Sequence, residues 1–267
     1  MNRVVLIGAT SRLSSAIRNQ NQNALFVSRE IYTAWDQSDE LEELISNFQE
    51  ATIIINKAVL DSNIDDKMIY HWNYYFPRFV IETVLKYKSN CRVLTIGSIH
   101  ESSSINNTYL RSKRKLANYI ESKKDARFKH IRLHTIYGEG VPIPNMFIGQ
   151  IFDSILCNKP FAMSSGLQYR QYHDYFHVAK HILTIVENWE SSESFINLNG
   201  HEWLRLKDMA IAVFDAFDKT ELLKIGELSN IEKEVTILPT LEGESFQFPE
   251  AIPSIISYLR KTISEKS

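Results

Sequence analysis

A tyrosine and a lysine four positions apart, Tyr109 and Lys113, are the residues of this sequence best suited to acid–base chemistry. Positions i and i+4 share one face of a helix, so the two side chains can act together. A free tyrosine has a pKa of about 10, and a nearby cation favours the phenolate and lowers that pKa. The pair therefore indicates proton transfer to or from a carbonyl or hydroxyl group near neutral pH. Ser98 could hydrogen-bond the same oxygen and hold it in place.

The same spacing occurs a second time, at Tyr119 and Lys123. Position along the chain favours Tyr109, because the stretch from Tyr109 to the apolar run at Ile131 is long enough for a full helix and a connection. The stretch that follows Tyr119 is too short for both. Tyr119 also continues an apolar stripe with Leu116, so we predict that Tyr119 packs against its neighbours.

The elements that must position these residues follow from a regular alternation of short apolar runs and longer helical patterns. Segments such as 39–48 and 73–87 carry apolar residues three and four positions apart, as amphipathic helices do. The short runs are rich in β-branched residues and apolar throughout, which is typical of parallel strands buried on both faces. The alternation predicts an α/β fold with a doubly wound parallel sheet. The runs are Val4–Ile7, Leu25–Val27, Thr52–Ile55, Val93–Ile96 and Ile131–Leu133.

The character of the chain changes after Gly138, where prolines surround a short helical pattern, Met146–Leu156. Two further apolar runs follow, Phe161–Met163 and Phe195–Leu198. We predict a dinucleotide-binding core with the catalytic residues over residues 1–140. Residues 141–267 are expected to form mainly a small C-terminal substrate-binding lobe, interleaved with the last strand of the core.

The first apolar run leads into a turn that could hold a phosphate group, Gly8-Ala9-Thr10-Ser11-Arg12-Leu13-Ser14. A dinucleotide-binding turn needs a residue free to take unusual φ values at the strand exit, and little bulk where the backbone approaches the pyrophosphate. Gly8 meets the first need. Ser11 and Ser14 occupy the other two glycine positions and could donate hydrogen bonds to an anion at a helix N-terminus. Alternatively, the segment is an ordinary connection between a strand and a helix.

The second run ends at Ser28 and Arg29, where a dinucleotide-binding unit meets the adenosine ribose. A cation at this place accommodates a 2′-phosphate, so Arg29 and the nearby Arg12 favour NADP, with NAD as the alternative. Both arginines could instead be solvated surface charges. Asp36 could accept a hydrogen bond from the adenine amino group, or it could cap a helix.

Taken together, these features resemble the extended short-chain dehydrogenase/reductase family, in its NAD-dependent epimerase/dehydratase branch. The resemblance spans nearly the whole chain and implies a Rossmann fold. Besides the phosphate turn, Asp36 and the three catalytic candidates, it rests on Asn56-Lys57-Ala58, on Asn73, on the segment 132–138, on His173-Asp174-Tyr175-Phe176-His177-Val178, and on the segment 195–200.

The resemblance also implies roles for individual residues. Asn56 and Ala58 would contact the cofactor, Asn73 would brace the active site, and Lys113 would hold the cofactor ribose. We further assign His100, Asn145 and Arg170 to the substrate, a nucleotide-activated sugar. The helices that hold Asn73 and Tyr109 often pair in this family, which makes a homodimer possible.

Several departures from the family pattern bear on the reaction. Two glycines of the dinucleotide motif are serines, and Thr135 stands in place of an asparagine. His173 replaces an arginine that commonly contacts the substrate diphosphate. Arg170, three residues earlier, could reach the same place. Neither an Asp-Glu pair nor a Thr-Asp-Glu triplet of the kind used by dehydratases follows the run 93–96. We therefore predict an NADPH-dependent reductase of a 4-keto-6-deoxy nucleotide sugar, as in cell-surface polysaccharide synthesis. The alternatives are an epimerase of the same fold and a non-catalytic dinucleotide-binding protein.

Composition argues against several other classes of protein. The 267 residues carry a net charge of −2, which implies no bulk attraction to nucleic acid or to an anionic membrane. No uncharged stretch is long enough for a membrane helix. The two cysteines form no disulfide framework, and we expect a cytoplasmic protein. His173, His177 and His181 recur every four residues, but no carboxylate or cysteine completes a metal site, so no metal is expected.

Overall fold

The computed structural model describes residues 3–35, 39–48, 50–57, 64–87, 89–229 and 245–266. Two of the expected cofactor contacts, Asp36 and Ala58, lie outside these described residues. The chain forms two compact units: the first comprises Met1–Leu133 and Ala179–Leu198, and the second comprises His134–Val178 and Asn199–Ser267. We call them unit 1 and unit 2.

Unit 1 is built on a six-stranded parallel sheet with the strand order β10-β5-β4-β3-β1-β2. The predicted doubly wound parallel sheet is confirmed. Strand β3 is buried along its whole length, and β1 is buried except at Arg3, because their other residues are apolar or small. The strands are β1 (Arg3–Ile7), β2 (Leu25–Val27), β3 (Ala51–Ile55), β4 (Arg92–Ser98), β5 (Phe128–Leu133) and β10 (Phe195–Asn197).

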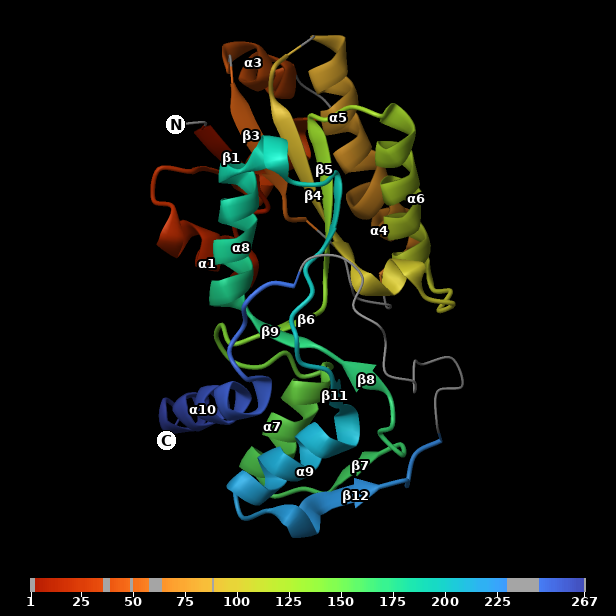
Figure 1. Ribbon diagram of the computed structural model, residues 1–267, viewed down its shortest axis with the longest axis vertical. Helices are drawn as coiled ribbons and strands as arrows, with labels where there is room; N and C mark the ends of the chain where they lie inside the picture. The colour runs from red at the N-terminus through yellow and green to blue at the C-terminus, as the bar shows by residue number, and fades with distance from the viewer. Residues whose placement is uncertain are drawn as a thin grey trace. The chain divides into compact units, whose positions relative to one another are not determined.

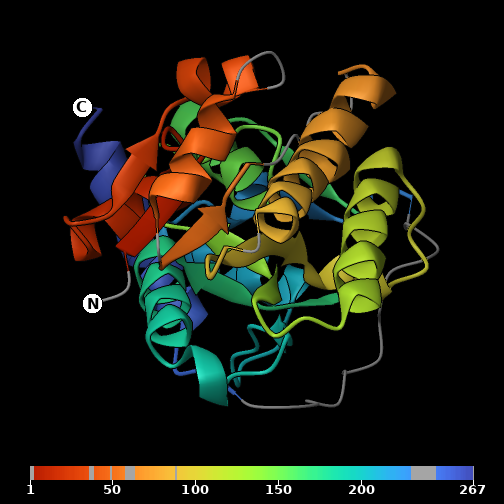
Figure 2. The same ribbon diagram turned by 90° about the horizontal axis from the view of Figure 1, so that it is seen from above.

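Helices cover both faces of this sheet (Figure 1). On one face lie α3 (Glu40–Asn47), α5 (Phe76–Lys86) and α6 (Thr108–Lys123); on the other lie α1 (Arg12–Gln20) and the unit 1 part of α8 (Tyr175–Glu187), as Figure 2 shows from above. The short α2 (Arg29–Ala34) follows β2 directly. The main core lies between the sheet and the helices α3, α5 and α6, which turn their apolar stripes inward.

The helix that carries Asn73 begins earlier than the pattern from residue 73 predicted. It starts with α4 (Asp66–Tyr70), continues through a π-helical turn, His71–Tyr75, and runs on into α5. π-Turns of this kind occur often at functional sites. The turn buries Asn73 completely, and the Asn73 Nδ2 donates a hydrogen bond of 3.2 Å to Ser112 Oγ on α6.

In the described residues of unit 2, helices α7, α9 and α10 pack around an apolar core that includes Phe152, Phe161, Phe214 and Leu259. None of the helices in the part of the chain that the structure describes is long and apolar enough to cross a membrane. The helices are α7 (Phe147–Cys157), α9 (Leu206–Ala216) and α10 (Ala251–Ser264). The strand pairs are β6 (Thr135–Tyr137) with β9 (Tyr172–Asp174), β7 (Phe161–Met163) with β12 (Leu223–Ile225), and β8 (Tyr169–Arg170) with β11 (Leu204–Arg205).

Candidate active site

The structure brings Tyr109 and Lys113 onto one face of α6 in unit 1. The helix starts just before Tyr109 because the Asn107 side chain caps it, accepting a hydrogen bond of 2.8 Å from the Leu110 N–H. The Lys113 Nζ lies 6.0 Å from the centre of the Tyr109 ring. Ser98 ends β4, so a strand end and a helix N-terminus supply the three side chains.

Lys113 is buried and already anchored. Its Nζ donates a hydrogen bond of 2.6 Å to the Ile96 carbonyl at the end of β4. Burial lowers the pKa of Lys113 to about 8, and the negative charge of Glu101 limits this fall. An ammonium group has three donors, so this anchor leaves two for a ligand.

The environment of Tyr109 differs from the sequence-based expectation. Burial raises the pKa of Tyr109, and the charge of Glu101 raises it further. The expectation that Lys113 would lower this pKa is therefore wrong for the protein without a cofactor, because desolvation of the phenolate outweighs the attraction of the cation. Near neutral pH, Tyr109 is a neutral phenol, which is a proton donor.

Ser98 is held from two sides by the single 3-10 turn that follows it, Ile99–Ser102. Its backbone N–H donates a hydrogen bond of 2.8 Å to Glu101 Oε1, and its Oγ accepts one of 3.3 Å from the N–H of His100. A hydroxyl that accepts one bond still has its own proton to donate. Ser98 is thus placed to donate to an oxygen atom.

The phosphate turn is cross-linked by the two serines that replace glycines. Ser11 caps α1 by accepting a hydrogen bond of 3.1 Å from the Ser14 N–H, and Ser14 Oγ donates one of 2.7 Å to the Gly8 carbonyl. Asn56, just after β3, donates from Nδ2 to Ser11 Oγ at 2.5 Å and to Ser14 Oγ at 3.0 Å. The polar groups at the carboxyl ends of β1 and β3 therefore form one hydrogen-bonded network.

The remaining turn residues divide into buried and accessible ones. Gly8 has a φ of +96°, and a Cβ atom there would lie 2.4 Å from the Asn56 carbonyl oxygen, so only glycine fits. Thr10 is exposed, Arg12 is half-buried at the start of α1, and the Leu13 side chain packs into the core. Thr10, Arg12 and the backbone at the start of α1 are the groups that can meet an anion.

Two cations follow the strands on either side of β1. In the sheet, Val27 and Ile55 both stand opposite Ile7, and Arg29 and Lys57 each come two residues later. Burial lowers the pKa of Lys57, and the charge of Arg29 lowers it further, which shows that the two positive charges act on each other.

An aromatic ring attracts Lys57, and a carboxylate lies next to Arg29 in the chain. The Lys57 Nζ lies 5.3 Å from the centre of the buried Trp72 ring, an attractive cation–π arrangement. Glu30, next to Arg29, is exposed; a hydrogen bond from the Ser28 hydroxyl is the main reason that its pKa is lowered. A carboxylate, Glu30, therefore accompanies Arg29 beyond the end of β2.

The expected substrate residues of unit 2 lie on different elements. Asn145 is exposed ahead of α7, and its carbonyl accepts a hydrogen bond of 3.4 Å from Gln150 Nε2. Arg170 is on β8, and its Nη1 donates to the Tyr169 carbonyl at 3.0 Å. His173 is buried on β9 and stacks on Phe248, with 3.7 Å between ring centres.

The three regularly spaced histidines do not share one helix face, because His173 is on β9 while His177 and His181 are on α8. His177 Nδ1 lies 2.8 Å from Asp174 Oδ2, so the two side chains hydrogen-bond. Within the described ranges, no group of three or more His, Cys, Asp or Glu residues is arranged to hold a metal ion.

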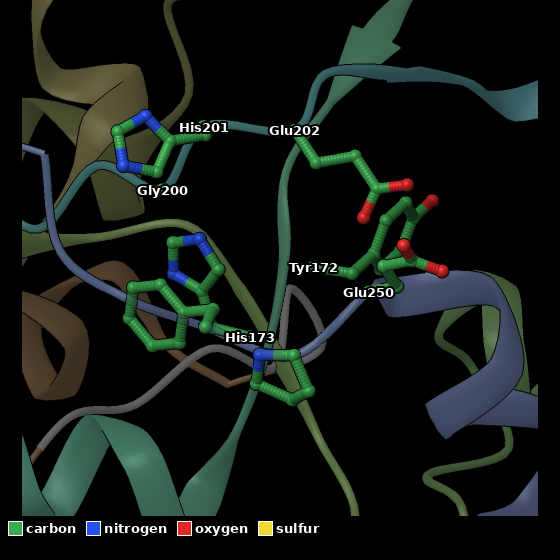
Figure 3. Close-up of a pocket in the computed structure, with 8 residues that line it drawn as sticks. Tyr172, His173, Gly200, His201, Glu202 and Glu250 are labelled. Carbon is green, nitrogen blue, oxygen red and sulfur yellow. The ribbon is translucent and has the colours of Figure 1, made fainter.

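Unit 2 also contains a pocket of about 400 Å³ beside the N-terminus of α10 (Figure 3). Two carboxylates face it, and Glu202 Oε2 accepts a hydrogen bond of 2.8 Å from the Ala251 N–H, which caps α10. These negative charges disfavour an anionic group in the pocket. The lining residues are Tyr172, His173, Gly200, His201, Glu202, Phe248, Pro249 and Glu250.

Comparison with solved structures places this arrangement among known folds. The chain is similar to UDP-glucose 4-epimerase from Thermotoga maritima, with a TM-score of 0.77 at 13% identity, covering 98% of this chain and 99% of that one. The chain shares the fold of this epimerase. The Rossmann fold expected from the sequence is thereby confirmed.

Other solved structures with this fold differ in reaction. A dTDP-glucose 4,6-dehydratase from Bacillus anthracis, solved with NAD, matches with a TM-score of 0.75 at 13% identity, covering 100% of this chain and 97% of that one. A dTDP-4-dehydrorhamnose reductase from Clostridium acetobutylicum matches with a TM-score of 0.71 at 12% identity, covering 97% and 99%. No protein-family model and no curated protein matches the sequence.

Sequence reasoning missed two residues that the fold brings to this site, Glu101 and Lys57. The spacing Ser98-x-x-Glu101 is a capping-box pattern, and this signal could have indicated the contact with the Ser98 backbone. Lys57 belongs to the segment Asn56-Lys57-Ala58, for which the resemblance implied roles only for Asn56 and Ala58, so a role for the charge of Lys57 was not predicted. Both residues are needed to explain the electrostatics described above.

Proposed function

We propose that the protein is an NADPH-dependent reductase that acts on a keto group of a nucleotide-activated sugar, of the 4-keto-6-deoxy type. One observation carries this proposal: the Tyr109 ring centre lies 6.0 Å from the Nζ of the buried Lys113, in surroundings that favour the protonated phenol. A reductase needs a proton donor at the keto oxygen, whereas an enzyme that begins by oxidising a hydroxyl needs a proton acceptor there.

The chain's own residues have distinct parts in this reaction. When bound, NADPH supplies the hydride that forms the new C–H bond at the keto carbon. Tyr109 donates its phenolic proton to the keto oxygen, which completes the hydroxyl group, and later regains a proton from water. Ser98 orients the oxygen, and Lys113 holds the ribose while its charge stabilises the Tyr109 phenolate.

The described residues of unit 1 fit a dinucleotide. Gly8 allows the sharp strand exit, and Thr10 and Arg12 are accessible at the start of α1, where anions bind. The structure also shows one departure: the Ser14 N–H is already used by Ser11.

For the substrate we assign His100 in unit 1 and Asn145 and Arg170 in unit 2, and the proposal includes a homodimer.

Cofactor preference should follow from the two cations beyond β2 and β3. If Arg29 and Lys57 both face the 2′-phosphate, Arg29→Ala and Lys57→Met should each weaken NADPH binding about tenfold to a hundredfold, since charge-assisted hydrogen bonds contribute about 1.5–3 kcal/mol. NADH binding should be nearly unchanged. Titration of both cofactors at moderate salt measures this.

A matched control for this experiment removes a cation elsewhere in unit 1. Arg18 in the last turn of α1 lies over the Phe26 ring at 4.2 Å, so Arg18→Ala should leave both affinities as they are. Equal affinities of the unmodified protein for NADPH and NADH would show that Arg29 and Lys57 are surface charges only.

The reaction itself is tested by following NADPH absorbance with dTDP-linked and UDP-linked 4-keto-6-deoxy sugars. We expect one NADPH to be consumed for each sugar reduced. The second candidate is an epimerase, favoured by Glu30, because an acid near the end of β2 accepts the ribose hydroxyl of NAD. Conversion of the sugar without net consumption of NADPH would support the epimerase, and no conversion would favour a non-catalytic dinucleotide-binding protein.

A further inference from the structure

A buried carboxylate lies directly behind Ser98. The Glu101 side chain is only 2% exposed, yet it belongs to a short turn at the end of β4. Its Oε1 accepts from the Ser98 N–H at 2.8 Å, and its Oε2 lies 3.0 Å from both His130 Nε2 and Arg132 Nε. A carboxylate at this depth requires such donors and a counter-charge.

The histidine in this network links the carboxylate to the sheet without neutralising it. His130 is fully buried on β5, and its Nδ1 lies 2.7 Å from Thr95 Oγ1 on β4. Burial lowers the pKa of His130, so its ring is neutral near pH 7 and donates from Nε2 to Glu101. The charge of Glu101 is therefore balanced by Arg132 and by Lys113.

Glu101 is ionised across the physiological range. Burial alone would raise its pKa, but the hydrogen bond from His130, the charge that His130 carries once it is protonated at low pH, and the hydrogen bonds from Ser98 and Arg132 bring the pKa of Glu101 to about 2. A permanent negative charge thus stands behind the catalytic candidates.

The turn that carries this charge is also fastened to α6. Arg114, which follows Lys113 in the chain, donates from Nε to the Glu101 carbonyl at 2.7 Å and from Nη2 to the Ser103 carbonyl at 2.8 Å and to the Ile105 carbonyl. The distance between Glu101 and the α6 residues is therefore held by a rigid connection.

The charge acts on both members of the catalytic pair. Burial is the largest cause of the raised pKa of Tyr109, and the charge of Glu101 is the second. For Lys113, burial lowers the pKa and the charge of Glu101 opposes this fall. Both effects favour the protonated forms. Among the described residues, Glu101 from the turn acts on both members of the pair, and the charge of Lys113 also acts on His130 of β5.

We propose that Glu101 is the positioning residue of this site: its carboxylate fixes the backbone of Ser98, and its turn, fastened to α6 through Arg114, places a negative charge behind Tyr109 and Lys113. This inference rests on the proposed reductase function. Glu101 touches neither substrate nor cofactor in this scheme and acts through Ser98, Tyr109 and Lys113.

The first test needs no substrate. In Glu101→Gln, the shape and the acceptor for Ser98 remain while the charge is lost. The titration of Lys113, followed by the NMR shift of its ε-carbon and assigned with Lys113→Arg, should move to lower pH by about one unit. Because this measurement uses the free protein, it tests Glu101 even if the protein proves not to be a reductase.

Two further variants control for loss of structure. Glu82→Gln removes an exposed acid that hydrogen-bonds Arg78 and Tyr119, so it should leave the Lys113 titration unchanged. Arg132→Gln removes the cation that balances Glu101, so it should move the titration to higher pH. Loosened packing alone cannot move the Lys113 titration in opposite directions in Glu101→Gln and Arg132→Gln. If Glu101→Gln fails to fold, Arg132→Gln still tests the proposal.

With NADPH and a keto-sugar substrate, kcat of Glu101→Gln should begin to fall at a lower pH than in the unmodified protein, because Tyr109 loses its proton more easily. KM for NADPH should change little. The proposal would be overturned if Lys113 titrated at the same pH in the unmodified protein, in Glu101→Gln and in Arg132→Gln. It would also be overturned by a uniform drop in the kcat of Glu101→Gln with an unchanged pH profile.

Discussion

Phenylalanine in place of Tyr109 should lower kcat about 10²–10⁴-fold, the usual contribution of a positioned general acid. The change removes one hydroxyl and keeps the ring, whose face lies near the Lys113 ammonium. NADPH binding should stay close to that of the unmodified protein, because in the proposed reaction Tyr109 acts on the substrate oxygen. Steady-state kinetics and a cofactor titration on the same samples separate the two effects.

The chain provides a matched control on the same helix. Tyr119 has the same spacing to a lysine, but its hydroxyl is 3.3 Å from Glu82 on α5 and its ring packs edge-on against Tyr74. Tyr119→Phe should therefore leave kcat unchanged. Undiminished turnover in Tyr109→Phe would remove Tyr109 from the reaction.

Alanine in place of Gly97 should destabilise unit 1 severely. A Cβ atom at this position would lie 2.2 Å from His130 Nε2 and 2.3 Å from Glu101 Oε1, well inside van der Waals contact. The added methyl group must separate His130 from the buried Glu101 carboxylate, and leaving a buried charged group without a hydrogen-bond partner costs about 1–3 kcal/mol or more. Urea unfolding measures the loss of unfolding free energy.

Gly140→Ala serves as the comparison for this effect. Gly140 has a φ of +62°, but no atom lies within 4 Å of a Cβ placed there. That substitution should cost only the backbone strain of a left-handed residue, about 1–2 kcal/mol. Similar losses in both variants would mean that the contacts of Gly97 with the buried pair are unimportant for stability.

The strands of unit 1 were predictable from the sequence because a strand covered on both faces must be apolar throughout. The run Leu25–Val27 matches β2 at both ends, and Thr52–Ile55 differs from β3 by a single residue. The start of the helix around Asn73 was predicted too late, because the π-helical turn shifts the apolar spacing and hides α4. Local periodicity cannot reveal an inserted turn.

The electrostatics of the site could not be read from spacing. The raised pKa of Tyr109 depends on burial and on Glu101, and the low pKa of Glu101 depends on His130, which is 29 positions away in the chain. Likewise, the mutual influence of Arg29 and Lys57 arises only because two strands flank β1 in register. Such contacts exist only once the sheet has formed.

The cross-linked phosphate turn has a thermodynamic consequence for ligand binding. Ordering one backbone residue costs about 1–2 kcal/mol in conformational entropy, and a glycine-rich loop has the most freedom to lose. Here Ser14 and Asn56 already hold the turn through one buried and one partly buried hydrogen bond, so this entropy is lost when the protein folds and not when a ligand arrives. A dinucleotide should therefore meet a preformed surface, and its association should carry little entropic penalty from this loop.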